Sequence, residues 1–190
     1  MNLTKVLTIV FVLIAVGIGY YLINSIISTV EEEERIARIE NRVIEKLQFI
    51  RDAQLAYKDV NGQFTSDWDK LISFIDSGDF YLTERSETII PREYGGDSVV
   101  INVDTLGTIP VYDSLYSDIE NFKLENLPFK PGTKNKFEIF ADKIIKGSVQ
   151  VDVFEVKDPD PINPKRRKDD NDKALRVGSR SEVTTAGNWE

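Results

Sequence analysis

The first thirty residues form an almost unbroken apolar run. No charged residue lies between Lys5 and Glu31, and Val, Ile, Leu, Phe, Tyr and Ala fill 18 of the 25 positions of residues 6–30. As a helix, residues 6–27 reach about 33 Å at 1.5 Å per residue, enough to cross a hydrocarbon core of about 30 Å. The pattern predicts a transmembrane helix over residues 6–30, in contact with membrane lipid.

The flanking charges predict how this helix is oriented. Lys5 lies on one side of it and four glutamates at 31–34 lie on the other. Since Lys and Arg are enriched in cytoplasmic segments, we expect residues 1–5 in the cytoplasm and the rest in the periplasm, as in a single-pass protein of the bacterial inner membrane. The alternative is a secretory signal with residues 7–14 as its apolar core and cleavage at 15–17, although the apolar run is longer than a signal needs.

Residues 31–61 continue the helical pattern outside the membrane. No Pro or Gly occurs from residue 20 to residue 61, so the span is predicted to run into an amphipathic rod that ends at Asn61-Gly62. The apolar spacing averages 3.5 residues, which suits a coiled-coil seam, while Ile44 and Ala56 widen the stripe toward a face that packs on a core. The sequence leaves open whether the stripe forms a coiled coil or packs on a core. The stripe consists of Ile36, Ile39, Val43, Leu47, Ile50, Ala53 and Tyr57.

The same helix carries a candidate helix–helix interface. Ala15 and Gly19 are four residues apart, a spacing that lets a second helix approach closely in lipid. Asn24 is the one amide in the segment, and burying it would favour a partner. The candidate interface comprises Ala15, Gly19, Asn24, Ile36, Ile39, Val43, Leu47 and Ile50.

Residues 62–157 are predicted to form a globular α+β domain. Ser66 is placed to cap a short helix over 67–76, whose apolar side is core. After Gly78 the period becomes alternating, which indicates strands at 80–90 and 98–104 around a hairpin turn at 94–97, then a turn at 104–107 and an edge strand at 108–112.

Further alternation at 137–141 and 149–153 predicts two more strands, with a bulge where Phe154 and Val156 shift phase. The predicted architecture is an antiparallel meander with one face covered by the long helix.

The last part of the chain changes in composition. Residues 158–173 contain three prolines, a basic run at 165–168 and an acidic run at 169–172, and are predicted to form an exposed loop. The basic run is also able to touch anionic lipid or an acidic neighbour. Residues 174–190 are predicted to pack back on the domain through Leu175, Val177, Val183 and Trp189.

Composition excludes most familiar chemistry. The 190 residues include no His and no Cys, so the usual zinc, haem and iron–sulfur sites and His-dependent triads are absent. A net charge of -8 argues against nucleic acid as a partner. The acidic run at 169–172 lacks the spacing of a calcium loop. We expect no enzyme activity, no catalytic, metal or cofactor site and no small-molecule substrate.

A local motif at the end of the rod resembles the type IV pilin-like proteins, including the pseudopilins of type II secretion systems. The resemblance lies in Tyr57 at the helix end, Gly62 in the turn, the aromatic Phe64 after it and Leu71 in the next segment. Residues 1–5 lack the Gly and Glu of the family's prepilin peptidase site, which is compatible with a pilin-shaped protein that stays anchored. The whole chain is also similar to membrane-anchored proteins of the Bacteroidetes type.

The resemblance implies a non-enzymatic structural subunit of a secretion, pilus or motility assembly. Its partners would be further copies of the chain or other envelope subunits. The alternative is a monomeric membrane-anchored binding module on the outer side of the membrane, whose rod would be fully covered by its own domain.

Overall fold

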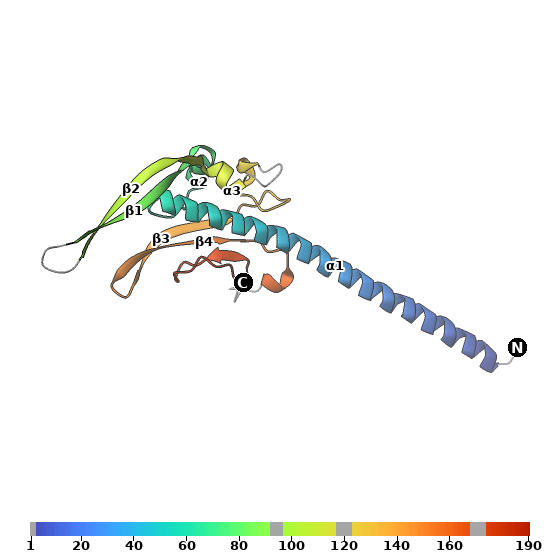
Figure 1. Ribbon diagram of the computed structural model, residues 1–190. Helices are drawn as coiled ribbons and strands as arrows, with labels where there is room; N and C mark the ends of the chain where they lie inside the picture. Colours follow the sequence, from blue (N-terminus) through green and yellow to red (C-terminus); the bar gives the residue numbers. More distant parts are fainter. Residues whose placement is uncertain (1–2, 92–96, 117–122, 168–173) are drawn as a thin grey trace.

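The computed structural model describes residues 3–91, 97–116, 123–167 and 174–190. In these residues the chain is α+β, with a long rod that carries a folded head at its C-terminal end (Figure 1). Two short 3₁₀ turns are labelled η. The elements are α1 (Leu3–Asn61), α2 (Trp68–Ser77), β1 (Asp79–Pro91), β2 (Asp97–Pro110), α3 (Val111–Tyr116), η1 (Leu124–Asn126), β3 (Glu138–Lys146), β4 (Val149–Lys157), η2 (Pro164–Arg166) and β5 (Arg176–Gly178).

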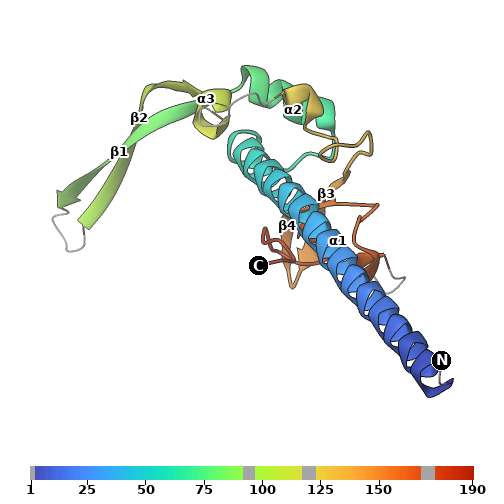
Figure 2. The same cartoon turned by 90° about the vertical axis from the view of Figure 1, so that its right-hand side faces the viewer.

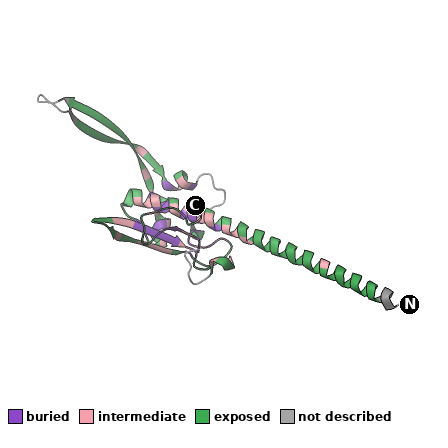
Figure 3. Cartoon of the chain, turned by 90° about the horizontal axis from the view of Figure 1, so that it is seen from below, coloured by how far each residue is buried: buried purple, intermediate pink, exposed green. Residues whose placement is uncertain are grey.

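The rod is one uninterrupted helix of 59 residues, α1, as the absence of Pro and Gly beyond residue 20 predicts. Its N-terminal part is long and apolar enough to cross a membrane, and none of that part is buried within the chain. Figure 3 shows it exposed along its length. The helix ends as expected at Gly62, whose φ of 75° favours glycine and whose N–H donates to the carbonyl of Lys58 at 2.7 Å.

The core lies where the C-terminal third of α1 enters the head. Val43, Leu47, Ile50 and Ala53 are buried, so the predicted stripe packs on the chain's own domain from residue 43 onward. Ile36 and Ile39, closer to the apolar N-terminal part of α1, are half-buried. The residues of α1 meet a set of buried side chains from the rest of the head: Leu71, Ile75, Tyr116, Leu127, Phe137, Phe154, Val156, Leu175 and Val177.

The short helix α2 begins one residue later than predicted, and Asp67 caps it in place of Ser66. Asp67 is extended, and its Oδ1 accepts hydrogen bonds from the N–H groups of Asp69 at 2.9 Å and Lys70 at 3.4 Å. The N–H of Asp67 is itself held by the hydroxyl of Thr65 at 3.1 Å. Since a carboxylate also favours the positive end of the helix dipole, Asp67 is the better cap.

The prediction of one antiparallel meander is wrong, because the strands form two separate sheets. β1 and β2 make a two-stranded ribbon, while β3, β4 and β5 make a three-stranded sheet in that order. α1 packs against the three-stranded sheet, whereas the ribbon projects away from the rod (Figure 2). Most of the predicted hairpin turn at 94–97 lies outside the described residues.

The predicted turn at 104–107 is a β-bulge. Leu82 pairs with Gly107 and Thr83 with Thr105, which leaves Leu106 as an extra residue in β2. The strand therefore continues to Pro110. The predicted edge strand at 108–112 is wrong beyond that point, because Val111 starts α3 and donates its N–H to the carbonyl of Gly78 at 2.8 Å.

The bulge predicted in β4 is absent, since its register with β3 is regular from Lys146–Val149 to Glu138–Lys157. Phe154 and Val156 belong to the core next to α1, whereas Glu155 on the other face is paired with Arg176 and Arg180. Val153 and Phe154 are adjacent and both apolar because both faces of the strand are buried here. The shift of phase therefore reflects burial rather than an inserted residue.

The C-terminal segment packs back on the head, as predicted. Leu175 and Val177 are buried and Trp189 is half-buried, but Val183 is exposed. The segment 158–167 is less exposed than predicted, because the Asp158 carboxylate and the Lys130 ammonium form a buried ion pair at 2.7 Å. The acidic run at 169–172 lies outside the described residues.

Candidate functional site

The apolar N-terminal half of α1 presents its small residues to the surroundings. Ala15 and Asn24 are exposed, and a Cβ added to Gly19 would meet no atom within 4 Å. Near the C-terminal end of the apolar stretch, the hydroxyl groups of Ser28 and Thr29 donate to the carbonyl of Ser25 at 3.0 and 2.8 Å. Their hydroxyl hydrogens are thus bonded within the helix, which lowers the cost of placing these side chains in an apolar environment.

The interface residues predicted outside the membrane do not form one surface. Val43, Leu47 and Ile50 are buried in the chain's own core and are not available to a second copy. The sequence pattern did not show whether the stripe contacts a second helix or the chain's own core, because a coiled-coil seam and a core-facing stripe share nearly the same period. Ile36 and Ile39 remain half-buried.

The basic run contacts acidic side chains of α1 in the same chain. The guanidinium of Arg166 and the carboxylate of Glu40 are 2.6 Å apart, with side chains 25% and 17% exposed. Lys165 and Glu33 form a longer, exposed pair at 3.8 Å. The part of α1 that follows its apolar stretch is thus held to the head, and the acidic neighbour of the basic run is the helix itself.

Of the four residues predicted to form a pilin-like turn, Phe64 and Leu71 belong to the core of the head and Tyr57 packs against it. The rings of Tyr57 and Phe74 meet edge to face with centroids 5.2 Å apart, and those of Phe64 and Phe154 lie 4.5 Å apart. Leu71 is fully buried beneath them, and Gly62 makes the turn. The turn therefore fixes the position of α2 and β4 relative to the rod.

Gln54, on α1, holds the loop that follows the turn, and the sequence pattern did not single it out. Its side chain is fully buried; Nε2 donates to the carbonyl of Thr65 at 2.7 Å, and Oε1 accepts from the N–H of Thr65 at 3.1 Å. A buried amide that satisfies the backbone N–H and C=O of one loop residue acts as a clamp between helix and loop. The available signal was a polar residue flanked by Ala53 and Leu55 on an otherwise apolar stripe.

Burial shifts the pKa of one ionisable group on α1, Lys46, and of one on α3, Tyr116. Burial lowers the pKa of Lys46 to about 8 while its ammonium donates to the carbonyl of Asn126. Burial, with a smaller contribution from Asp52, raises the pKa of Tyr116, whose ring stacks on Phe49 with centroids 4.4 Å apart. Both shifts arise mainly from packing of the head on the rod.

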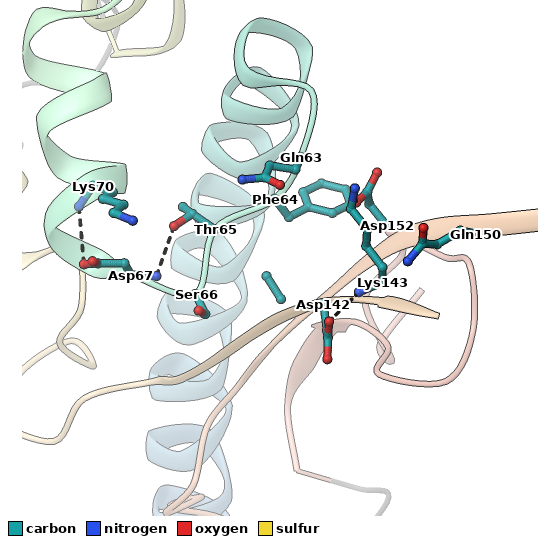
Figure 4. A pocket seen from close by; sticks show the side chains of 11 residues that line it. Gln63, Phe64, Thr65, Ser66, Asp67, Lys70, Asp142, Lys143, Gln150 and Asp152 are labelled. Atoms are coloured by element: carbon teal, nitrogen blue, oxygen red, sulfur yellow. Dashed lines mark hydrogen bonds and ion pairs between the residues drawn. The ribbon is translucent and has the colours of Figure 1, made fainter. Parts of the chain in front are cut away.

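A polar hollow of about 390 Å³ lies between the loop before α2 and the strands β3 and β4 (Figure 4). Asp142 accepts from the N–H of Lys143 at 2.8 Å, and the ammonium of Lys143 lies 3.7 Å from Asp152. Asp67 is used as the helix cap. Across the described ranges no three His, Cys, Asp or Glu side chains are grouped to hold a metal ion.

The β1–β2 ribbon is an uncovered surface of the head. The described side chains of residues 81–90 and 99–106 are all exposed. Sequence reasoning placed Val99, Ile101 and Val103 on one face, and the register agrees, but the long helix was expected to cover that face. Nothing in the described part of the chain does so, because the ribbon extends beyond the end of α1 (Figure 1).

Comparisons of the chain with protein-family models, curated proteins and solved structures found no match.

Proposed function

We propose that this chain is a non-enzymatic, single-pass envelope protein that serves as a pilin-like structural subunit of a secretion, pilus or motility assembly. The observation that carries the proposal is the division of α1 into two parts. Its N-terminal half is apolar and exposed, while its C-terminal third is built into the core of the head. One rigid element thus joins a membrane anchor to a folded domain.

The anchor is proposed to cross the inner membrane with the N-terminus in the cytoplasm and the head in the periplasm. Lys5 and the glutamates at 31–34 favour this orientation. Subunits then associate laterally in lipid through Ala15 and Gly19, where two helix backbones can approach closely. Since Val43, Leu47 and Ile50 are already buried, contacts outside the membrane use other surfaces of the head.

The turn at the end of the rod supports the pilin-like part of the proposal. In the resemblance, the pattern consists of Tyr at the helix end, Gly in the turn, an aromatic residue after it and Leu in the next segment. Here Tyr57 and Phe64 contact Phe74 and Phe154 in the head, Leu71 is part of its core, and Gly62 supplies the positive φ of the turn. The shape of a long N-terminal helix with a small head beyond it agrees with that role (Figure 1).

The test is the size of the complex formed by the full chain in mild detergent and by cross-linking in native membranes. We expect the natural chain to form oligomers and Gly19→Leu to reduce them at least about fivefold, because the added side chain separates the helices. The substitution fits the isolated subunit, since a Cβ at Gly19 meets no atom within 4 Å.

Gly17→Leu is the matched control. A Cβ at Gly17 is equally free of contacts, and Gly17 lies on the opposite side of the helix, about 200° from Gly19. Equal complex sizes for the two variants, or a natural chain that gives no cross-linked ladder, would contradict the assembly role. A monomeric result would favour an anchored binding module.

A further inference from the structure

A groove of about 430 Å³ lies between α1 and η2, the described element of the head nearest the apolar half of α1 (Figure 1). Ile36, Ala37 and Pro164 give the groove an apolar wall, and Glu33 and Lys165 bring one charge of each sign to it. The carboxylate of Glu33 and the ammonium of Lys165 are 3.8 Å apart, with side chains 67% and 84% exposed. Both charges are therefore accessible to whatever surrounds α1 at this level.

The turn η2 holds Lys165 at a defined position along the rod. The guanidinium of Arg166 pairs with the carboxylate of Glu40 at 2.6 Å, and both side chains are largely covered. The Oδ1 of Asn163 accepts from the N–H of Lys165 at 3.0 Å, and its carbonyl accepts from the N–H of Arg166 at 2.9 Å. Pro164 fixes φ at the start of the turn. The groove thus has two firm walls, and Lys165 stands at its open side.

The position of the groove along α1 decides which surroundings it meets. The apolar stretch ends at residue 30, and Glu33 follows about 4.5 Å farther along the axis. Helix side chains lean toward the N-terminus, so its carboxylate lies nearer still to the apolar stretch. The headgroup layer on each side of a bilayer is about 5 to 7 Å thick. When α1 spans a membrane, Glu33 and Lys165 therefore lie among phospholipid headgroups.

The charges at this level favour a headgroup that carries both signs. The glutamates at 31–34 surround the helix, since successive residues are about 100° apart, and they repel a purely anionic headgroup. Lys165 supplies a positive charge beside one of them. An ethanolamine headgroup has a phosphate that accepts from an ammonium and an ammonium that donates to a carboxylate. A choline headgroup has no N–H to donate.

We propose that the groove binds the headgroup of one ethanolamine phospholipid. Its phosphate lies at the ammonium of Lys165 and its ammonium at the carboxylate of Glu33, while the apolar wall of the groove packs against its methylene groups. The bound lipid joins η2 to the surface of the bilayer. This inference rests on the membrane anchor proposed above and gives the head a contact with the bilayer itself.

Native mass spectrometry of the full chain in mild detergent tests the proposal, because it counts the phospholipids retained by each chain. Phosphatidylethanolamine, phosphatidylcholine and phosphatidylglycerol with the same acyl chains are supplied in equal amounts. We expect one phosphatidylethanolamine per chain, retained at least about fivefold over either of the others. Equal retention would indicate an unspecific lipid shell, and preference for phosphatidylglycerol would indicate an anionic-lipid site; either result would overturn the proposal.

Two single substitutions locate the site. Lys165→Gln and Glu33→Gln each remove one charge of the groove and should lower the preference below about twofold. Both side chains are exposed, so the fold is not expected to change. Preference that persists in both variants would contradict binding in this groove.

Two matched controls carry the same changes of charge elsewhere. Glu31→Gln lies at nearly the same level of α1 but about 200° around the helix from Glu33. Lys146→Gln lies on the β3–β4 hairpin, at the opposite end of the head from η2 (Figure 1). Both should keep the preference of the natural chain. An equal loss in the controls would show that total charge, and not the groove, selects the lipid.

The two proposals fail in different ways. The mass of the same sample shows whether the chain keeps residues 1–17, so loss of the anchor is detected separately from lipid retention. If the anchor is present and Gly19→Leu reduces complex size, but no lipid is preferred, the assembly role stands and the lipid site is wrong. If phosphatidylethanolamine is retained and Gly19→Leu has no effect, the lipid site stands and the assembly contact is wrong.

Discussion

At the scale of single residues, Gln54 shows how one buried side chain joins the rod to the head. Thr65 lies in the loop between α1 and α2, where its backbone N–H and C=O have no helical hydrogen-bond partners and bond to Gln54 instead. The amide of Gln54 offers one donor and one acceptor, which matches what Thr65 requires. An aliphatic residue would fill the space but leave both groups unsatisfied.

Replacing Gln54 by Leu is expected to lower the free energy of unfolding by about 2 to 3 kcal/mol, because a buried N–H and a buried C=O lose their partners. Denaturant titration of the full chain in detergent measures the change. Fluorescence reports on the head, since both tryptophans, Trp68 and Trp189, lie in it.

Gln48→Leu is the control on the same helix. Gln48 is half-buried and its side chain does not hold the turn, so the change should stay within about 0.5 kcal/mol. An equal loss in both variants would mean that α1 is sensitive to any Gln→Leu change and that the clamp has no special role.

At the scale of elements, the helices could be predicted from local sequence patterns, whereas the pairing of distant strands could not. α1 was predictable because its period and its lack of Pro and Gly are properties of adjacent residues. The division of the strands into two sheets was not, because alternation in residues 98–104 and 149–153 does not say which strand pairs with which. The sequence at 104–107 resembles a turn, and only the partner strand β1 shows that Leu106 is a bulge.

The candidate site was predictable to a similar extent. Gly62 makes the turn after α1, and Phe64 and Leu71 belong to the core of the head with Tyr57 packed against it. Val43, Leu47 and Ile50 were assigned to an interface that the chain's own sheet occupies. Which face of an amphipathic helix stays free depends on contacts with residues more than a hundred positions away, and those contacts leave no local pattern.

The attachment of η2 to α1 also belongs to this scale. Glu40→Gln should increase hydrogen exchange at the Arg166 N–H about fivefold, which corresponds to a partly exposed pair worth about 1 kcal/mol. That N–H donates to the carbonyl of Asn163 at 2.9 Å and reports on the turn. Hydrogen-exchange mass spectrometry or NMR provides the measurement.

The double variant Glu40→Arg with Arg166→Glu should restore slow exchange, since the pair is re-formed with its charges exchanged. Glu33→Gln should leave the exchange rate unchanged, because Glu33 and Lys165 are exposed and 3.8 Å apart. Fast exchange in the double variant would show that packing, rather than the ion pair, holds η2.

At the scale of the whole molecule, the absence of cysteine allows the topology to be measured directly. In intact cells with a permeable outer membrane, Ser181→Cys is expected to react with a membrane-impermeant maleimide. Ser181 is exposed on the head, which the proposed orientation puts in the periplasm. A cysteine added before Met1 should react only after the inner membrane is opened.

A chain in which the added cysteine never reacts, and whose mass corresponds to a start after residue 17, would support the cleaved signal over the anchor. Labelling of the N-terminal cysteine in intact cells would reverse the orientation. The two cysteine positions therefore separate the three arrangements.

The continuity of α1 has a geometrical consequence. The stretch from residue 30, where the apolar part of the helix ends, to the first buried core residue, Val43, rises about 20 Å, and no joint interrupts it. Any turn of the anchor about its own axis within the bilayer swings the β1–β2 ribbon through the same angle. The way in which neighbouring anchors face each other in lipid would therefore determine the direction in which each ribbon points in the plane parallel to the membrane.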